Sequence, residues 1–198
     1  MSGTFPTSPA PAAVTIRSLQ PTLVSVAHSL QRQARSRGGQ RWGFKLAWPN
    51  MRRADFAPLL AFALAQRGQF ETFTLALPNL STPLGTWAGT PVVDGAGQSG
   101  RSVNLRGFTA GATVKAGDFV KFFGHDKVYM ATADAMAGGP GTIALAIEPA
   151  LLAAPADGAA VTADGVAFTC AFAGDMHETT FAPGMFCTFE ADLVEVVT

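Results

Sequence analysis

Few residues of this sequence have the type and spacing that metal binding requires. The histidines His28, His125 and His177 are far apart, and no HExxH, His-x-His or paired CxxC motif accompanies them. Zinc sites in proteins are built on such short spacings. The cysteines Cys170 and Cys187 lie in apolar, strand-like runs, which favours buried free thiols. We therefore expect no metal site and no cofactor.

Catalytic motifs are equally weak. Residues 97–100 read G-x-S-G, and residues 95–100 read G-x-G-x-x-G, but neither has the strand before it and the helix after it that a nucleophile elbow or a dinucleotide site needs. Asp118, Asp126 and Asp134 could serve as carboxylates for glycoside hydrolysis, yet they fall at strand ends and turns, where Asp is common. The sequence predicts that the protein is not an enzyme.

Composition points instead to a β-rich subunit of an assembly. The 198 residues carry 14 basic and 14 acidic side chains, so the net charge is zero and only 14% of residues are charged. This balance argues against a nucleic-acid binder or an anionic-membrane binder. The 15 Phe, 21 Gly and 13 Pro indicate many strands and turns. The N-terminus lacks the basic and apolar regions of a signal peptide, and no apolar run is long enough for a membrane span, so we expect assembly in a cytoplasm without membrane insertion.

The first domain is organised around a short apolar helix that leads into a strand. We predict that the helix starts near Asp55, which places Pro58 in the first turn, where a missing N–H costs little. Arg67 would lie in the last turn, and Gly68 would end the helix in a left-handed conformation. From Phe70 to Leu77 the period changes to two, which predicts a strand.

A strand over residues 41–48 should supply the other half of this core. Four large side chains alternate with small or charged ones along it, so they share one face and require a partner layer. The nearest candidate is the apolar face of the helix. The expected core and assembly scaffold consists of Trp42, Phe44, Leu46 and Trp48 on the strand and Phe56, Leu59, Leu60 and Ala63 on the helix.

Ahead of this strand the chain is less regular. Residues 1–13 hold four prolines and predict an extended arm, either reaching over a neighbouring subunit or disordered. Residues 14–19 and 22–28 predict two strands, and residues 29–40 a long hairpin loop. This loop contains Arg32, Arg35 and Arg37. It would serve as a phosphate-binding or partner-binding finger, or as a solvated or intersubunit loop, which the absence of aromatics favours.

Beyond residue 78 the composition changes. Residues 79–100 have linker chemistry, and short strands with turn signals every 8 to 12 residues follow, which predicts a small closed barrel. A last strand, 185–196, carries Glu190, Asp192 and Glu195 and would pair with the first domain. We therefore predict a domain of residues 1–88 and 182–198 with a barrel of residues 89–181 inserted in it. The barrel strands are expected at 101–108, 118–123, 127–133, 141–147, 160–162 and 166–172.

Taken in order, four segments carry a family resemblance: RWGFKLAWPNMRRADFAPLLAFALAQRGQFETFTLALP, KAGDFVKFFGHDKVYMATAD, IALAIEPALLAAPADGAAV and FEADLVEVV. Their order resembles the distal tail proteins of long-tailed bacteriophages, in the variant that adds an oligonucleotide/oligosaccharide-binding (OB) fold module. The resemblance implies a mainly β fold: a tail-tube-like β-sandwich with one packed α-helix, plus an inserted OB-like β-barrel.

The resemblance also implies a function. Six copies would close into a structural ring that joins the tail tube protein to the hub of the tail tip or baseplate and leaves a channel for DNA. The protein would then be found in the virion, after assembly in the host bacterial cytoplasm. Basic walls would retain DNA, so we expect a neutral or acidic channel lined by Glu190, Asp192 or Glu195.

Two alternatives stay open. One is a carbohydrate-binding receptor module with Trp87 as the platform for a sugar, and the other is a minor subunit of the tube or hub. OB barrels also bind oligonucleotides, but the aromatic residues of this barrel are interleaved with few basic ones, which favours core packing or docking over specific nucleic-acid binding.

Overall fold

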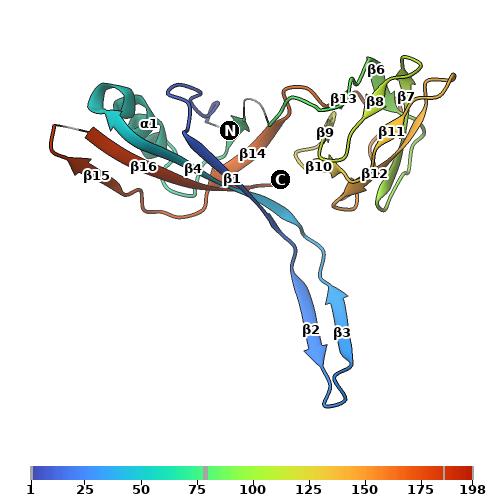
Figure 1. Ribbon diagram of the computed structural model, residues 1–198, viewed down its shortest axis with the longest axis horizontal. Helices are drawn as coiled ribbons and strands as arrows, with labels where there is room; N and C mark the ends of the chain where they lie inside the picture. Colours follow the sequence, from blue (N-terminus) through green and yellow to red (C-terminus); the bar gives the residue numbers. More distant parts are fainter. Residues whose placement is uncertain (1, 78–79, 185, 198) are drawn as a thin grey trace. The chain divides into compact units, whose positions relative to one another are not determined.

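The structure is a computed structural model that describes residues 2–77, 80–184 and 186–197. Its contacts divide the chain into two compact units: Met1–Phe73 with Cys170–Val196, and Thr74–Thr169 with Val197–Thr198. Strands dominate both, and the described residues hold one α-helix (Figure 1), so the mainly β fold class is confirmed. Among the described residues, no helix has the length and apolar character needed to cross a membrane.

A six-stranded sheet, with antiparallel pairing among β1, β4, β16, β14 and β15, forms the core of the first unit. The strand order is β1-β4-β16-β14-β5, and β15 pairs with β16 at one end. β5 and β14 lie where the chain passes between the two units. The strands are β1 (Ala13–Leu19), β4 (Arg41–Arg52), β5 (Phe73–Ala76), β14 (Ala167–Phe172), β15 (Thr179–Ala182) and β16 (Phe186–Glu195).

β4 is longer than predicted, because Pro49 does not end it. The strand runs on to Arg52, and β16 pairs with both Met51 and Arg52. The register of this pairing shifts between Cys187 and Phe189, opposite the proline. A bulge of this kind accommodates a residue that cannot donate a ladder hydrogen bond.

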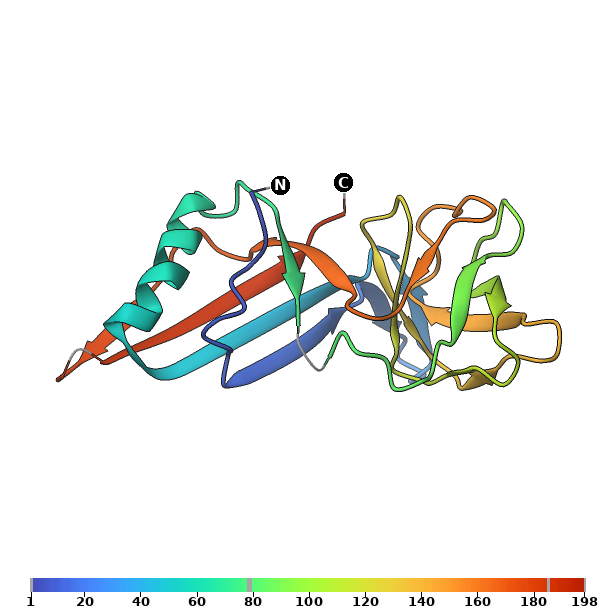
Figure 2. The ribbon, with the colours of Figure 1, turned by 90° about the horizontal axis from the view of Figure 1, so that it is seen from above.

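The helix α1 (Arg53–Ala65) follows β4 without a loop, and it lies over one face of the β4–β16 part of the sheet (Figure 2). The predicted start at Asp55 is therefore wrong, and Pro58 lies beyond the first turn, on the exposed side of the helix. Arg67 lies past the last turn. Arg67 and Gly68 both take positive φ angles, 55° and 68°, so Gly68 does adopt the predicted left-handed conformation.

The N-terminal arm packs on its own unit. Phe5 is 5% exposed and lies among the rings of Trp48, Phe62 and Phe73 at centroid distances of 5.3 to 6.0 Å. The indole N–H of Trp48 donates to the Pro9 carbonyl at 2.9 Å. Neither predicted fate of the arm, reaching over a neighbour or disorder, describes residues 2–12, since one buried aromatic side chain ties them to the core.

The predicted long loop is also wrong, because it contains a strand. β2 (Thr22–Val26) pairs with β3 (Arg32–Ser36), and a short turn at 27–31 joins them. This pair continues from the β1–β4 pair after an irregular step at residues 20–21 and 37–40 (Figure 1). We call residues 22–36 the hairpin ribbon.

The second unit is a nearly closed barrel. Its six-stranded sheet has the order β13-β9-β10-β12-β7-β6. The two edge strands meet through a bridge between Val92 and Ala160, and Val93 N–H donates to the Ala159 carbonyl at 3.0 Å. The strands are β6 (Gly89–Val93), β7 (Ser102–Phe108), β9 (Phe119–Phe122), β10 (Val128–Ala131), β12 (Ile143–Glu148) and β13 (Val161–Thr162), with a separate pair β8 (Thr113–Val114) and β11 (Ala135–Met136).

Two assignments near the barrel are corrected. The predicted linker contains β6, which pairs with β7. The predicted barrel strand 166–172 is β14, which pairs with β16 in the other sheet. Local alternation cannot tell which sheet accepts a strand, since that depends on pairing between distant residues. The predicted first residue of the last strand, Met185, lies outside the described residues.

Candidate assembly surfaces

Seven of the eight predicted scaffold residues are buried. Trp42, Phe44, Leu46 and Trp48 alternate on one face of β4, and Phe56, Leu59 and Ala63 lie on α1. Leu60 is only half-buried, because it sits at the margin of the helix face that meets the sheet. Phe189 of β16 connects strand and helix, with ring centroids 5.7 Å from Trp48 and 5.5 Å from Phe56.

The opposite face of this sheet is polar and carries two of the predicted channel residues. Glu190 Oε2 lies 2.6 Å from Lys45 Nζ, and Asp192 Oδ1 lies 3.4 Å from an Arg17 guanidinium nitrogen. Two acids thus face two bases. Glu195 points to the other, apolar face, where it is fully buried and accepts the Trp42 N–H at 3.2 Å. Glu195 therefore cannot line a channel with the other two.

A groove of about 830 Å³ lies between this polar face and residues 173–178, which connect β14 to β15. Its lining includes the carboxylates of Glu178, Glu190 and Asp192, the guanidinium of Arg17, and apolar side chains such as Met176. We call this pocket the acidic groove.

His177 also lines the acidic groove. Its ring lies 4.3 Å from that of Phe172, centroid to centroid. Burial lowers the pKa of His177 below its usual value. Its Nε2 atom is buried without a hydrogen-bond partner among the described residues. His177 is therefore neutral at physiological pH and adds no positive charge to the groove.

The predicted partner residues lie on the hairpin ribbon and beside it. Arg32 and Arg35 belong to β3, and Arg37 follows it, with its backbone N–H donating to the Pro21 carbonyl at 2.9 Å. All three side chains are exposed. No ion pair joins any of them to another residue in the part of the chain that the structure describes.

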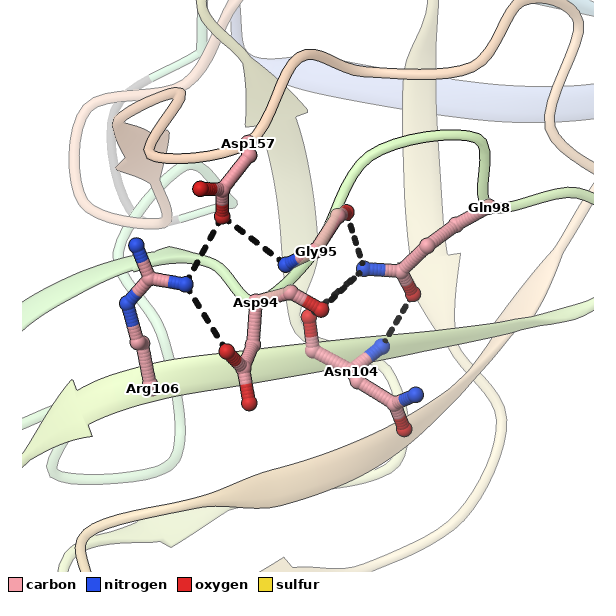
Figure 3. Close-up of polar contacts among 6 residues, drawn as sticks. All are labelled: Asp94, Gly95, Gln98, Asn104, Arg106 and Asp157. Atoms are coloured by element: carbon pink, nitrogen blue, oxygen red, sulfur yellow. Dashed lines mark hydrogen bonds and ion pairs between the residues drawn. The ribbon is translucent and has the colours of Figure 1, made fainter.

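A polar cluster fastens two loops of the barrel (Figure 3). Arg106 donates to Asp94 at 2.8 Å and to Asp157 at 2.7 Å, and Asp157 also accepts the Gly95 N–H at 2.8 Å. Hydrogen bonds to Asp157 and Asp94 raise the pKa of Arg106. The same guanidinium, together with the Gly95 amide, holds the pKa of Asp157 below its usual value.

Gln98 completes the cluster. Its amide nitrogen donates to the carbonyls of Asp94, Gly95 and Asn104 at 2.9 to 3.2 Å, and its oxygen accepts the Asn104 N–H at 2.6 Å. The groups of the cluster thus satisfy one another. The G-x-G-x-x-G motif at residues 95–100 therefore belongs to a loop that hydrogen bonds hold in place. We call the six residues of this cluster (Asp94, Gly95, Gln98, Asn104, Arg106 and Asp157) the latch.

Asp118 is a second fixed point of the barrel. This carboxylate is 2% exposed and accepts four N–H groups, the shortest at 2.6 Å from Leu84. One donor is the Trp87 indole, at 2.8 Å, and the Trp87 ring packs 5.7 Å from that of Phe108. Trp87 is 8% exposed, so it is a core residue rather than a platform for a sugar. The remaining donors to Asp118 are the backbone N–H groups of Gly85 and Lys115.

Asp126 and Asp134 do not join Asp118 in a catalytic group. Asp134 pairs with Lys115 at 2.7 Å and accepts the Ala116 N–H, which lowers the pKa of Asp134. Asp126 accepts from the Thr169 hydroxyl at 3.4 Å. Within residues 2–77, 80–184 and 186–197, no group of three or more His, Cys, Asp or Glu side chains could hold a metal ion.

The sequence reading missed the residues whose partners are far along the chain. Phe5, Phe189 and Asp118 carry no local signal beyond their residue type. Arg106 does carry one: a charged residue within a predicted strand needs either solvent or a partner. This signal predicts that Arg106 has an acidic partner, but it does not identify Asp94 and Asp157 as the partners.

The fold defines a class: a mainly β protein with two six-stranded sheets, whose clustered polar groups hold loops and strands in place. Residues 80–166 match the family model described as distal tail protein pb9, B domain. This match covers less than half of the chain, and it supports the predicted phage distal tail protein and a structural role in the phage tail. The matched family is structural rather than enzymatic. No curated protein matches the chain.

Proposed function

We propose that six copies of this protein form a ring that connects the tail tube to the hub of the tail tip or baseplate and leaves a channel for DNA. The match of residues 80–166 to the distal tail protein B domain carries this proposal. The tail tube protein, the hub and other copies of the chain would be its partners. Assembly would take place in the host bacterial cytoplasm.

The mechanism of such a ring is geometric. The β1–β4–β16 sheet buries one face under α1 and leaves the other polar, with Lys45 against Glu190 and Arg17 against Asp192. A face with balanced charge suits a channel wall, since a basic wall would retain passing DNA by releasing its counterions. In the proposed ring, Glu190 and Asp192 line the channel.

The second unit would be an inserted, OB-like barrel at the periphery of the ring. In this proposal the ring domain is the unit of Met1–Phe73 and Cys170–Val196, and the insertion is Thr74–Thr169. These bounds replace the predicted 1–88 with 182–198 and 89–181, because β14 and β15 pair with β16. The barrel has its own apolar core and two polar fastenings, the latch around Arg106 and the hydrogen bonds of Asp118. Such a module can carry fibres or meet the cell surface without contributing to the ring contacts.

Light scattering after size-exclusion chromatography tests the ring. The purified full chain should elute, at concentrations of tens of micromolar, as a closed species with six times the mass of one chain. A chain that stays monomeric at every concentration, alone and with the tail tube protein, would contradict the proposal.

A further inference from the structure

The hairpin ribbon carries positive charge that nothing nearby in the sequence balances. Residues 22–37 contain three arginines, and the first 54 residues of the chain contain no Asp or Glu. Every residue from 22 to 39 is exposed. An isolated two-stranded ribbon is only marginally stable in water, because it has no core of its own. A bound partner of negative charge would balance the arginines and stabilise the ribbon.

Another copy of the chain is a poor source of that negative charge. Of the 14 Asp and Glu side chains, seven are in ion pairs within the described residues, and four more accept hydrogen bonds. The other three belong to different elements: Asp55 to α1, Asp164 to the turn after β13, and Glu178 to the segment before β15. The described part of the chain therefore presents no row of free carboxylates.

Donor side chains form a row on one face of the ribbon. The register pairs Gln33 with Ser25 and Arg35 with Leu23, and cross-strand partners share a face. Arg37 continues the row, because its N–H hydrogen bond of 2.9 Å to the carbonyl of residue 21 extends the ladder. Residues two apart along a strand point to the same side. We call the face with Gln33, Arg35 and Arg37 the donor face.

The opposite face of the ribbon is mostly apolar. Val24 pairs with Ala34, and Val26 pairs with Arg32, so these four side chains share that face. Arg32 is thus separated from the other two arginines. A partner that is recognised by its charge meets the donor face, where two guanidinium groups and one amide follow one another along the chain.

The spacing of the donor face matches the phosphates of DNA. Side chains at every second residue of a strand recur at about 6.4–6.8 Å, twice the rise per residue. Each strand of duplex DNA has one phosphate per about 3.4 Å of helix axis, so every second phosphate recurs at about 6.8 Å. Arginine and glutamine side chains both donate to phosphate oxygens. The carboxylates of a folded protein have no fixed repeat of this kind, so the repeat favours DNA.

We propose that the hairpin ribbon binds the phosphate backbone of duplex DNA without reading its sequence. Arg35 and Arg37 each pair with a phosphate, and Gln33 donates to a third on the same strand. Two charge contacts give weak binding by one ribbon, and several copies on one duplex strengthen it. The ribbon is separate from the charge-balanced face of β1, β4 and β16, so the proposed channel wall is unchanged. The inference goes beyond the proposed ring and does not require it.

Fluorescence anisotropy of a labelled duplex of mixed sequence, titrated with the full chain, tests the contact. Arg35→Gln with Arg37→Gln keeps the side chains long and removes both charges. For each ribbon engaged, the slope of log affinity against log salt should become shallower by about 1.8, a difference of about 10-fold between about 50 and 200 mM salt. Circular dichroism should show an unchanged fold, since every residue of the ribbon is exposed.

Two matched controls remove the same kind of charge elsewhere. Arg32→Gln changes the opposite face of the ribbon. Arg52→Gln with Arg53→Gln removes two exposed arginines outside the ribbon that have no ion pair with any described residue. Both controls should bind DNA within about 2-fold of the unaltered chain and keep its salt slope. Equal losses in the controls and in the donor-face variant would overturn the proposal.

The remaining outcomes separate DNA from other anions and the inference from the ring. Poly-glutamate that competes as well as DNA at equal charge, or binding to anionic phospholipid vesicles without binding to DNA, would overturn the proposal. So would a strong preference between duplexes of different sequence. A chain that forms rings and does not bind DNA would sink the inference and leave the ring, whereas a DNA-binding monomer would do the reverse.

Discussion

The two units differ in how their charged side chains are partnered. In the barrel, ion pairs and short hydrogen bonds join charged groups within the unit: Arg101 with Glu148, Arg106 with Asp94 and Asp157, and Lys115 with Asp134. In the other unit, the cations of the hairpin ribbon have no ion pair with any described residue. The first unit also has ion pairs of its own, Arg17 with Asp192 and Lys45 with Glu190. The difference is therefore confined to the ribbon, whose arginine side chains are exposed.

The largest loss of stability is expected from a substitution in the core beneath α1. Leu59 is 2% exposed. A Leu→Ala change at such a site costs about 2–5 kcal/mol of stability. Leu59→Asp loses the same apolar contacts and also buries a carboxylate that has no partner. We expect it to unfold the unit of residues 1–73 and 170–196. Hydrogen exchange resolved along the chain would measure this, with protection retained in the barrel.

The matched control is Leu60→Asp at the next position. Leu60 is half-buried at the margin of the same helix face, so its carboxylate can reach water and the unit should stay folded with reduced stability. Equal loss of protection in both variants would mean that the helix packs on the sheet differently. Loss of protection in the barrel as well would mean that the units fold as one.

Asp118 offers the next largest effect, confined to the barrel. Asp118→Ala leaves four N–H donors without their acceptor, and each donor that stays buried and unsatisfied should cost about 1–3 kcal/mol. Thermal unfolding followed by circular dichroism should show a barrel transition at lower temperature. Phe123→Ala is the control, because that ring is 79% exposed and its removal should change little.

Acid should weaken the latch around Arg106 by a smaller amount. Asp157 has a pKa below its usual value of 3.8 because it accepts from Arg106 and Gly95. The folded state thus binds fewer protons, so the stabilisation is present above pH 3.8 and is lost as pH falls through the lower folded pKa. Arg106→Gln should be less stable than the unaltered chain at neutral pH, by an amount that shrinks in acid. Urea unfolding at several pH values measures this, and a constant difference would contradict it.

The smallest effect on folding should come from the ribbon. Replacing Arg32, Arg35 and Arg37 with Gln removes no contact within the chain, so the free energy of unfolding should change by less than about 0.5 kcal/mol. Urea unfolding of this variant beside the unaltered chain measures the difference. A large loss of stability in this variant would mean that the arginines serve their own chain.

Sequence reasoning reached the elements with strong local patterns. The alternation of Trp42 to Trp48 predicts a strand with one buried face, which the structure confirms. Gly68 takes the predicted left-handed conformation, although the helix already ends at Ala65. Sequence reasoning failed where distant pairing decides. Pro49 lies inside β4 because β4 is bulged there, with Pro49 and Asn50 opposite the single residue Thr188 of β16. β14 leaves the barrel because β16 pairs with it.

The candidate surfaces show the same division between features that a local pattern predicts and features that depend on distant residues. Alternation along β16 separates Glu190 and Asp192 from Glu195, and residue parity alone could have shown this. The burial of Trp87 could not have been predicted, because it depends on Asp118, 31 residues away in the chain. The latch likewise joins Arg106 to Asp157 across 51 residues.

Electron microscopy of the intact tail tests the central claim most directly. The account predicts a ring of six copies of this chain at the junction of the tail tube and the tail tip, with an open channel. A particle in which this chain lies elsewhere, or in which its copies do not touch one another, would contradict it.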